Sequence, residues 1–149
     1  MDSTPATFLQ PGRLERLFNR LFGFLVGMGI GPSYNYLLQV QGRKSGRVYS
    51  TPVNMLDFKG KRLLVAPRGE TQWVRNARAS GHVWLKRGRS RHRFTLRALD
   101  DREKPEILKE YLNRYRMAVR RYFKVSADEP TEAFSGIASE YPVFELIPD

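Results

Sequence analysis

The chain has 149 residues, no cysteine and 2 histidines, and 41% of its residues are hydrophobic. This length and composition predict one folded domain over residues 1–149. The absence of cysteine excludes disulfides, thiolate metal ligands and cysteine nucleophiles, and it fits a reducing cytoplasm. We expect no metal site, because the spacing of His82 and His92 matches no zinc pattern. The net charge of +11 predicts an anionic partner: nucleic acid, a phosphorylated cofactor or an acidic lipid surface.

Residues 1–33 form a predicted helical N-terminal segment. Between Leu14 and Met28, apolar residues recur at helical spacing and polar or basic residues fill the other face, which predicts an amphipathic helix. Such a helix either covers one side of the core or contacts a membrane surface, and both interpretations stay open. The apolar run Leu21–Gly31 is far shorter than the roughly 20 residues of a spanning helix. We therefore expect a cytoplasmic protein, with membrane association as the alternative.

Several short segments with β character lie between turn residues, which is typical of strands. They are Tyr36–Gln41, Val48–Phe58, Arg62–Ala66, His82–Lys86, Arg91–Leu99 and Val143–Ile147. Pro52 lies inside the second segment and marks an edge, a bulge or a close ligand approach, because proline donates no ladder hydrogen bond. Lys59 and Gly60 predict a hairpin turn after the second strand.

Two further helices are predicted between these strands. The first is Glu70–Ser80, with Gly81 as its C-cap, and the second is a single long helix over Arg102–Tyr122. The links between strands are too short for the crossovers of a parallel sheet. The order predicts an α+β fold that is mainly β, namely an antiparallel barrel flanked by N-terminal, central and C-terminal helices.

The most informative stretch is Gly42–Arg47, which reads Gly-Arg-Lys-Ser-Gly-Arg between two predicted strands. Two glycines permit positive φ, so that successive N–H groups can face one concavity, and Ser45 adds a hydroxyl donor. Lys44 and the flanking arginines add positive charge. The stretch therefore predicts an oxyanion-binding turn, and the alternative is a solvated turn that protects a sheet edge.

Four motifs in this order resemble the deazaflavin-dependent nitroreductase family. They are Gly-Arg-Lys-Ser-Gly-Arg at 42–47, Thr-Pro-Val at 51–53, Leu-Val-Ala-Pro-Arg-Gly at 64–69 and Trp-Val-Arg-Asn-Ala-Arg-Ala at 73–79. The resemblance covers roughly the central half of the chain. It implies a split β-barrel related to the barrels that bind flavin mononucleotide, with the reduced deazaflavin coenzyme F-420 as hydride donor.

The resemblance also implies which residues bind the coenzyme. Its phosphate and acidic tail would contact the hairpin residues Arg43, Lys44, Ser45, Gly46 and Arg47. The deazaflavin ring would face the backbone of Thr51, Pro52 and Val53, with Ala66, Pro67 and Arg68 on its other side. Trp73 and Asn76 would close the pocket from the helix.

Tyrosines of the last long helix are candidates for contact with the substrate. Relatives place tyrosines from this region over the substrate, which makes Tyr111 and Tyr115 candidates together with Trp73. Packing against the barrel is the alternative for such a stripe. No catalytic residue is assigned, because the cofactor carries the hydride and no side chain need act as a nucleophile.

The sequence therefore predicts an oxidoreductase that passes a hydride from reduced F-420 to a small molecule: a nitroaromatic, a quinone or an activated alkene. One alternative is a basic module that binds nucleic acid, although no recognition motif for nucleic acid is present. Another is a flavin mononucleotide or haem protein on the same barrel. The basic block Lys86–Arg93 reads as a solvated edge, or as a contact for nucleic acid or anionic lipid.

Overall fold

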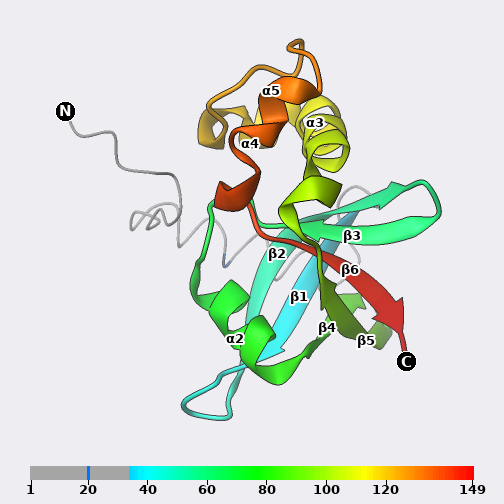
Figure 1. The fold of residues 1–149 in the computed structure, drawn as a ribbon. Helices are drawn as coiled ribbons and strands as arrows, with labels where there is room; N and C mark the ends of the chain where they lie inside the picture. The colour runs from blue at the N-terminus through cyan, green and yellow to red at the C-terminus, as the bar shows by residue number, and fades with distance from the viewer. Residues whose placement is uncertain (1–19, 21–33) are drawn as a thin grey trace.

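The computed structural model describes residue 20 and residues 34–149. Six strands form a closed barrel with helices packed on it (Figure 1). The strands are β1 (Asn35–Gln41), β2 (Val48–Phe58), β3 (Lys61–Val65), β4 (His82–Arg87), β5 (Ser90–Ala98) and β6 (Val143–Pro148). Their boundaries agree closely with the predicted ones, because alternating apolar residues and turn-forming residues mark both the faces and the ends of each strand.

The barrel is antiparallel throughout, with strand order β1-β2-β3-β6-β5-β4. The β2–β3 turn is the predicted tight hairpin, with positive φ at both Lys59 (52°) and Gly60 (78°). Closure depends on two pairings between strands that are not consecutive along the chain: β4 pairs with β1, and β3 pairs with β6. The predicted antiparallel barrel with flanking helices is confirmed.

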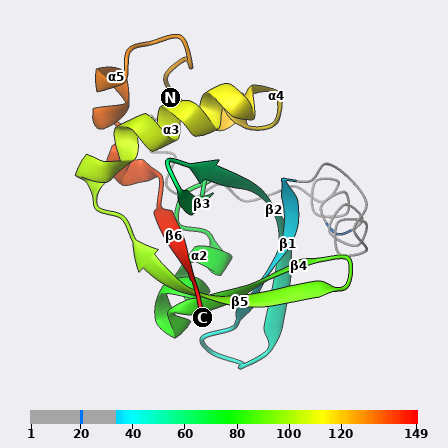
Figure 2. The same cartoon turned by 90° about the vertical axis from the view of Figure 1, so that its right-hand side faces the viewer.

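Helix α2 (Gln72–Ser80) closes one end of the barrel (Figure 2). Val74 and Ala77 on α2 are fully buried, and they pack into the same apolar cluster as Leu38 and Val83 from the barrel interior, called here the barrel cluster. The helix ends at Gly81, whose φ of 79° is the left-handed conformation predicted for this C-cap. Burial of this apolar helix face fixes α2 against the barrel.

A second apolar cluster lies between the barrel and the C-terminal helices α3 (Lys104–Arg114), α4 (Arg116–Val119) and α5 (Glu132–Ser135). Leu56 and Leu63 contribute from β2 and β3, and Leu108 and Phe134 contribute from α3 and α5. Figure 1 shows these helices as a layer beyond β2 and β3. α5 was not predicted, because one helical turn has too few residues for a periodic pattern.

The prediction of one long helix over Arg102–Tyr122 is wrong. α3 ends at Arg114, and the next residue, Tyr115, leaves the helical region with a φ of −116° and a ψ of 31°. The Tyr115 ring packs against Tyr34 and Tyr111, with centroids 4.9 and 5.2 Å away, and its hydroxyl donates a hydrogen bond to the Met55 carbonyl. Tertiary contacts of this one side chain therefore override a helical pattern that continues in the sequence.

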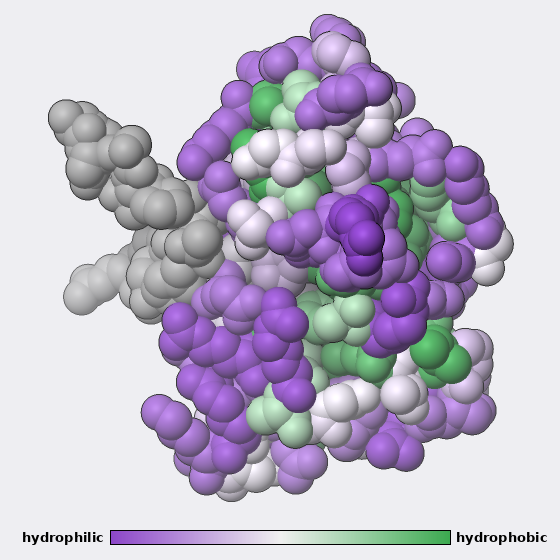
Figure 3. Space-filling model, viewed as in Figure 1, coloured by the Kyte–Doolittle hydropathy of each residue, from purple (hydrophilic) through white to green (hydrophobic). Residues whose placement is uncertain are grey.

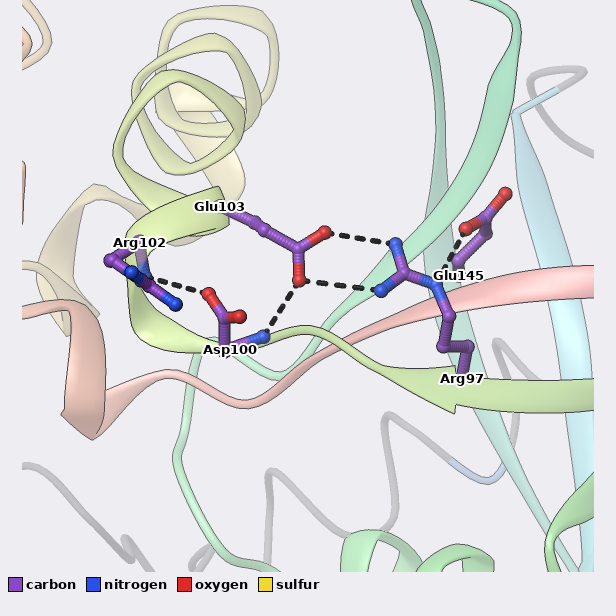
Figure 4. A network of polar contacts seen from close by, with 5 residues as sticks. All are labelled: Arg97, Asp100, Arg102, Glu103 and Glu145. Carbon is purple, nitrogen blue, oxygen red and sulfur yellow. Dashed lines mark hydrogen bonds and ion pairs between the residues drawn. The ribbon is translucent and has the colours of Figure 1, made fainter.

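A network of ion pairs joins the start of the C-terminal helices to the barrel (Figure 4). Asp100 and Glu103 form a capping box, in which the Asp100 N–H donates to Glu103 over 2.9 Å. Arg97 on β5 donates from Nη2 to Glu103 over 2.9 Å and from Nε to Glu145 on β6 over 3.0 Å. Hydrogen bonding from Arg97 lowers the pKa of Glu103. The network thus connects β5, β6 and the helical layer.

The predicted N-terminal helix and its lipid contact lie outside the described residues. Among residue 20 and residues 34–149, no helix is long and apolar enough to cross a membrane.

Candidate functional site

The predicted oxyanion-binding turn is the hairpin between β1 and β2, called here the basic hairpin (residues 42–47). The Gly42 N–H donates to the Arg47 carbonyl over 2.6 Å, and the Gly46 N–H donates to the Gly42 carbonyl over 3.0 Å. Gly46 has a φ of 76°, as the sequence predicts for a glycine in this turn. Gly42 is not at positive φ. A Cβ there would lie 2.6 Å from the Tyr49 ring, so any other residue at this position would require that exposed ring to move.

Ser45 organises the inside of the basic hairpin. Its hydroxyl accepts a hydrogen bond from the Arg47 N–H over 3.1 Å and lies 3.2 Å from the Tyr49 hydroxyl. Gln41 closes the turn from outside by donating to the Gly46 carbonyl over 3.3 Å. These contacts fix the backbone of a turn whose residues from Arg43 to Arg47 are all exposed.

Arg43 attaches the basic hairpin to α2. Its N–H and its Nη1 both donate to the Asn76 Oδ1, over 3.1 and 2.8 Å. The same Nη1 donates to the Gln72 side chain over 3.1 Å. Asn76 is only 6% exposed, so this amide is a buried acceptor committed to Arg43. The structure therefore brings Arg43 and Asn76 together, and it adds Gln72, which the sequence did not single out.

Lys44 and Arg47 extend the positive charge of the hairpin into solvent. Residues 42–47 carry three cations and no carboxylate, and both Lys44 and Arg47 are exposed. Figure 3 shows that hydrophilic residues cover most of the face seen in Figure 1, with smaller hydrophobic areas between them. An anion at this hairpin would meet cations whose turn is already held in place.

β2 has an open edge next to the basic hairpin. β3 pairs with β2 only over Met55–Phe58, whereas β1 pairs with β2 over Val48–Asn54. Within the described strands, the Val48–Asn54 stretch therefore has a partner on one side only. Pro52 lies in this stretch, which explains how a proline is tolerated inside a long strand.

The hydrogen-bond alternation of β2 shows which backbone groups face the open edge. The Met55 N–H donates to the Tyr34 carbonyl on the β1 side over 2.8 Å. Because bonded positions alternate in an antiparallel pair, Thr51 and Val53 also face β1, and Pro52 faces the open edge. The expectation that amides near Pro52 are free for a ring carbonyl therefore applies to Ser50, not to Thr51 or Val53, and Asn54 lies opposite Val65 in the β2–β3 register.

Ala66, Pro67 and Arg68 leave the barrel after β3. The Ala66 N–H donates to the Pro142 carbonyl over 2.9 Å, and the Gly69 N–H donates to Ala66 over 3.2 Å. Ala66 is buried in the barrel cluster, whereas Pro67 is only partly buried. The Arg68 guanidinium lies 5.8 Å from the Tyr122 ring centroid, so it is oriented toward the C-terminal helices.

Trp73 belongs to the barrel cluster as a partly buried residue. Its ring lies 6.2 Å from the Phe144 ring of β6 and is tilted by 58°. Trp73 is near Asn76 on α2, but Asn76 contacts Arg43 while Trp73 contacts the core. Trp73 therefore has a packing role whatever else its exposed part contacts.

The two candidate tyrosines differ in their surroundings. Tyr111 is 2% exposed inside the second cluster, and burial raises the pKa of its hydroxyl. Tyr115 is also buried, but it lines a small cavity of about 190 Å³ with Tyr34, Met55 and Arg114. Tyr111 therefore packs in the core, and Tyr115 borders this cavity.

The basic block of β4 and β5 makes contacts within the chain. Arg91 lies 4.5 Å from the Trp84 ring centroid and donates to Gln39 over 2.7 Å. Arg93 forms an ion pair with Asp149 over 3.1 Å. These exposed pairs are typical of a solvated sheet face, which was one of the interpretations of this block.

The closed antiparallel barrel with helices packed on it places the protein in the class of split β-barrels. The family whose model matches residues 14–129 is described as F420H(2)-dependent quinone reductase, and the chain belongs to this family. The predicted resemblance to deazaflavin-dependent reductases is confirmed. The protein is an F-420-dependent oxidoreductase, and its cofactor is coenzyme F-420.

Solved structures with the same fold are distant in sequence. One, titled a domain-swapped dimer, is 22% identical with a TM-score of 0.56, over 90% of this chain and 93% of that chain. An F420-H2 dependent reductase, FDR-A, is 21% identical with a TM-score of 0.52, over 76% and 94%. HutZ, a heme storage protein from Vibrio cholerae, is 10% identical with a TM-score of 0.51, over 93% and 92%. These similarities show the split-barrel fold. No curated protein matches the chain.

The basic hairpin fits a coenzyme that carries a phosphate and carboxylates. Its backbone is held by Ser45 and the Gly42–Arg47 hydrogen bond, and its cations are not balanced by a carboxylate within the turn. An anion is stabilised most by cations that need no rearrangement to meet it.

Proposed function

We propose that coenzyme F-420 binds along the open edge of β2, with its phosphate at the basic hairpin. The observation that carries this proposal is the contact of Arg43 with Asn76, which holds three cations beside that edge. Lys44 and Arg47 contact the phosphate and the acidic tail directly, and Ser45 and Gly46 supply hydroxyl and backbone donors. Arg43 acts mainly by keeping the hairpin against α2.

The ring of the coenzyme is proposed to lie between β2 and the segment that follows β3. The Ser50 N–H and the Ser50 and Pro52 carbonyls of the open edge supply polar contacts for it, with Thr51 and Val53 as flanking side chains. Ala66 and Pro67 form the opposite side. Arg68 and Trp73 close the site from the direction of the helices.

Bound F-420 in its reduced form supplies a hydride, and the acceptor takes up that hydride and one proton. The chain itself binds, orients and limits the access of water. Burial raises the pKa of Tyr115, and its hydroxyl donates a hydrogen bond to the Met55 carbonyl, so this tyrosine keeps its proton. We therefore propose that solvent provides the proton.

The acceptor is proposed to be a quinone, as the family description suggests. Tyr36 pairs with Val53 across β1 and β2, and it lines the 190 Å³ cavity together with Tyr115. The cavity therefore begins next to the proposed ring site. Tyr34, Met55 and Tyr115 offer flat or apolar surfaces suited to a planar acceptor.

The experiment is to follow oxidation of reduced F-420 by its absorbance, without oxygen, in the presence of menadione, nitrobenzene or cyclohexenone. We expect turnover with menadione at a higher kcat/KM than with the other two acceptors. Faster turnover with nitrobenzene or cyclohexenone would replace the quinone by that acceptor. Failure of F-420 itself to bind would contradict the proposed site.

A further inference from the structure

The end of the barrel opposite α2 contains a second cavity, called here the mouth cavity, with a volume of about 500 Å³. Alternate residues of β4 face the same side of the sheet, so Val83, Leu85 and Arg87 follow one another along the barrel interior, from the end near α2 to the cavity. Figure 2 shows the β4–β5 hairpin extending away from α2. The basic hairpin contacts α2, so the mouth cavity lies at the other end of the barrel from the proposed coenzyme phosphate site.

The mouth cavity has an apolar base and a cationic rim. Leu85 and Phe94 are buried side chains of the barrel cluster that line it. Arg62, Arg87 and His92 line it as well. A site that combines apolar surface with a few convergent polar groups is typical of a pocket for a small organic molecule, and its volume falls within the usual range of about 300–1,000 Å³.

Charge determines which small molecule fits. None of the described residues that line the mouth cavity is acidic. Arg62 pairs with Asp57 over 3.1 Å, but this carboxylate is 66% exposed and lies outside the lining. The Asn35 carbonyl accepts a hydrogen bond from Arg87 Nη1 over 2.8 Å, which fixes that guanidinium on the β1 side of the rim. Guanidinium groups held in place favour a planar carboxylate, which they contact through paired N–H donors.

We propose that the mouth cavity binds an organic anion with a flat apolar body, of the aromatic carboxylate class. The carboxylate contacts Arg62 and Arg87, with His92 nearby, and the ring packs on Leu85 and Phe94. Tyr36 and Ser90 add hydroxyl groups to the lining. A neutral ring carries no charge for Arg62 and Arg87 to contact, and a small inorganic anion leaves the apolar base uncovered.

The first test compares three probes with the full-length protein by calorimetry: benzoate, the neutral isostere benzamide, and inorganic phosphate. We expect benzoate to bind at least about tenfold more tightly than either of the others, the factor that one charged hydrogen bond supplies. Equal binding of benzoate and benzamide overturns the role of the cations. Equal binding of benzoate and phosphate overturns the role of the apolar base.

The second test locates the bound probe, because the chain has only 2 histidines. His92 lines the mouth cavity, whereas His82 follows α2 and lies edge-on to Trp84, with ring centroids 4.9 Å apart. We expect benzoate to shift the imidazole NMR signals of His92 and to leave those of His82 in place. A shift of His82 alone, of both or of neither overturns the proposal.

The third test changes the rim. Arg62→Gln and Arg87→Gln are each expected to weaken benzoate binding about tenfold. The matched control is Arg89→Gln, which removes the same charge from an exposed residue outside the lining. If Arg89→Gln weakens benzoate binding equally, net charge alone explains the effect, and the proposal is overturned. Unchanged His82 signals verify the fold of each variant, and the probe comparison on the unaltered protein does not depend on any variant folding.

Discussion

Replacing Asn76 by alanine tests the attachment of the basic hairpin to α2. The substitution removes the Oδ1 that accepts hydrogen bonds from the Arg43 N–H over 3.1 Å and from Arg43 Nη1 over 2.8 Å. A neutral hydrogen bond contributes about 1 kcal/mol and one to a charged group about 1.5–3 kcal/mol. Arg43 is exposed, so its charged bond belongs at the lower end of that range. We expect Asn76→Ala to lower the free energy of unfolding by about 2 kcal/mol.

The same change should weaken the binding of F-420, because the hairpin cations are no longer held beside β2. We expect the dissociation constant for F-420 to rise about tenfold, since the cations must then be ordered on binding. Urea unfolding measures the first effect, and a fluorescence titration with F-420 measures the second.

Gln72→Ala is the matched control for Asn76→Ala. Gln72 contacts the same Arg43 Nη1 over 3.1 Å, but it is exposed, and within residues 34–149 the Arg43 backbone N–H donates to Asn76 instead. Its loss should cost less than about 0.5 kcal/mol. If Asn76→Ala changed stability and F-420 affinity no more than Gln72→Ala does, the contact of Arg43 with Asn76 would contribute to neither, and the reasoning would be refuted.

Two further substitutions test the hairpin and the ion-pair network. Gly42→Ala places a Cβ 2.6 Å from the exposed Tyr49 ring, which can rotate away. We therefore expect the free energy of unfolding to fall by less than about 1 kcal/mol, while the affinity for F-420 also falls. Gly60→Ala is the control: it is strained by its φ of 78° but distant from the site, so it should lower stability and leave the affinity for F-420 unchanged. Glu103→Gln should lower the melting temperature at neutral pH. Folding lowers the pKa of Glu103, so its ionised carboxylate stabilises the folded state above the ordinary pKa of 4.5, and this stabilisation is lost as the pH falls through the pKa of the folded state. Melting curves of the two proteins should therefore converge in acid, and a constant difference at every pH would contradict the role of the ionised carboxylate.

Local patterns predicted the strands of the barrel, but they could not predict its closure. Alternation and turn residues such as Lys59 and Gly60 depend only on neighbouring residues, so they are visible in the sequence. The pairing of β3 with β6 joins Leu64 to Phe144, and nothing local to either strand specifies this partner. The break at Tyr115 is similar, because its cause is a hydrogen bond to Met55 on a distant strand.

The residue types of the candidate site could be predicted from the sequence, but their arrangement in space could not. Glycines and cations in one turn identified the basic hairpin, because these residue types are needed for an anion-binding backbone. The sequence assigned Arg43 to the phosphate, and its contact with Asn76 was not visible because 33 positions separate them. The mouth cavity was also not predicted, since Arg62, Arg87 and His92 come together only when the barrel closes.

The central claim is that the basic hairpin binds the anionic part of F-420. The most direct measurement is the dissociation constant for F-420 of Lys44→Gln/Arg47→Gln, compared with Lys59→Gln/Lys61→Gln on the β2–β3 hairpin at the other end of β2, which removes the same charge. We predict a rise of about a hundredfold for the first variant, from the loss of two charged hydrogen bonds, and less than about threefold for the second, from a screened field alone. Equal dissociation constants for the two variants would contradict the claim.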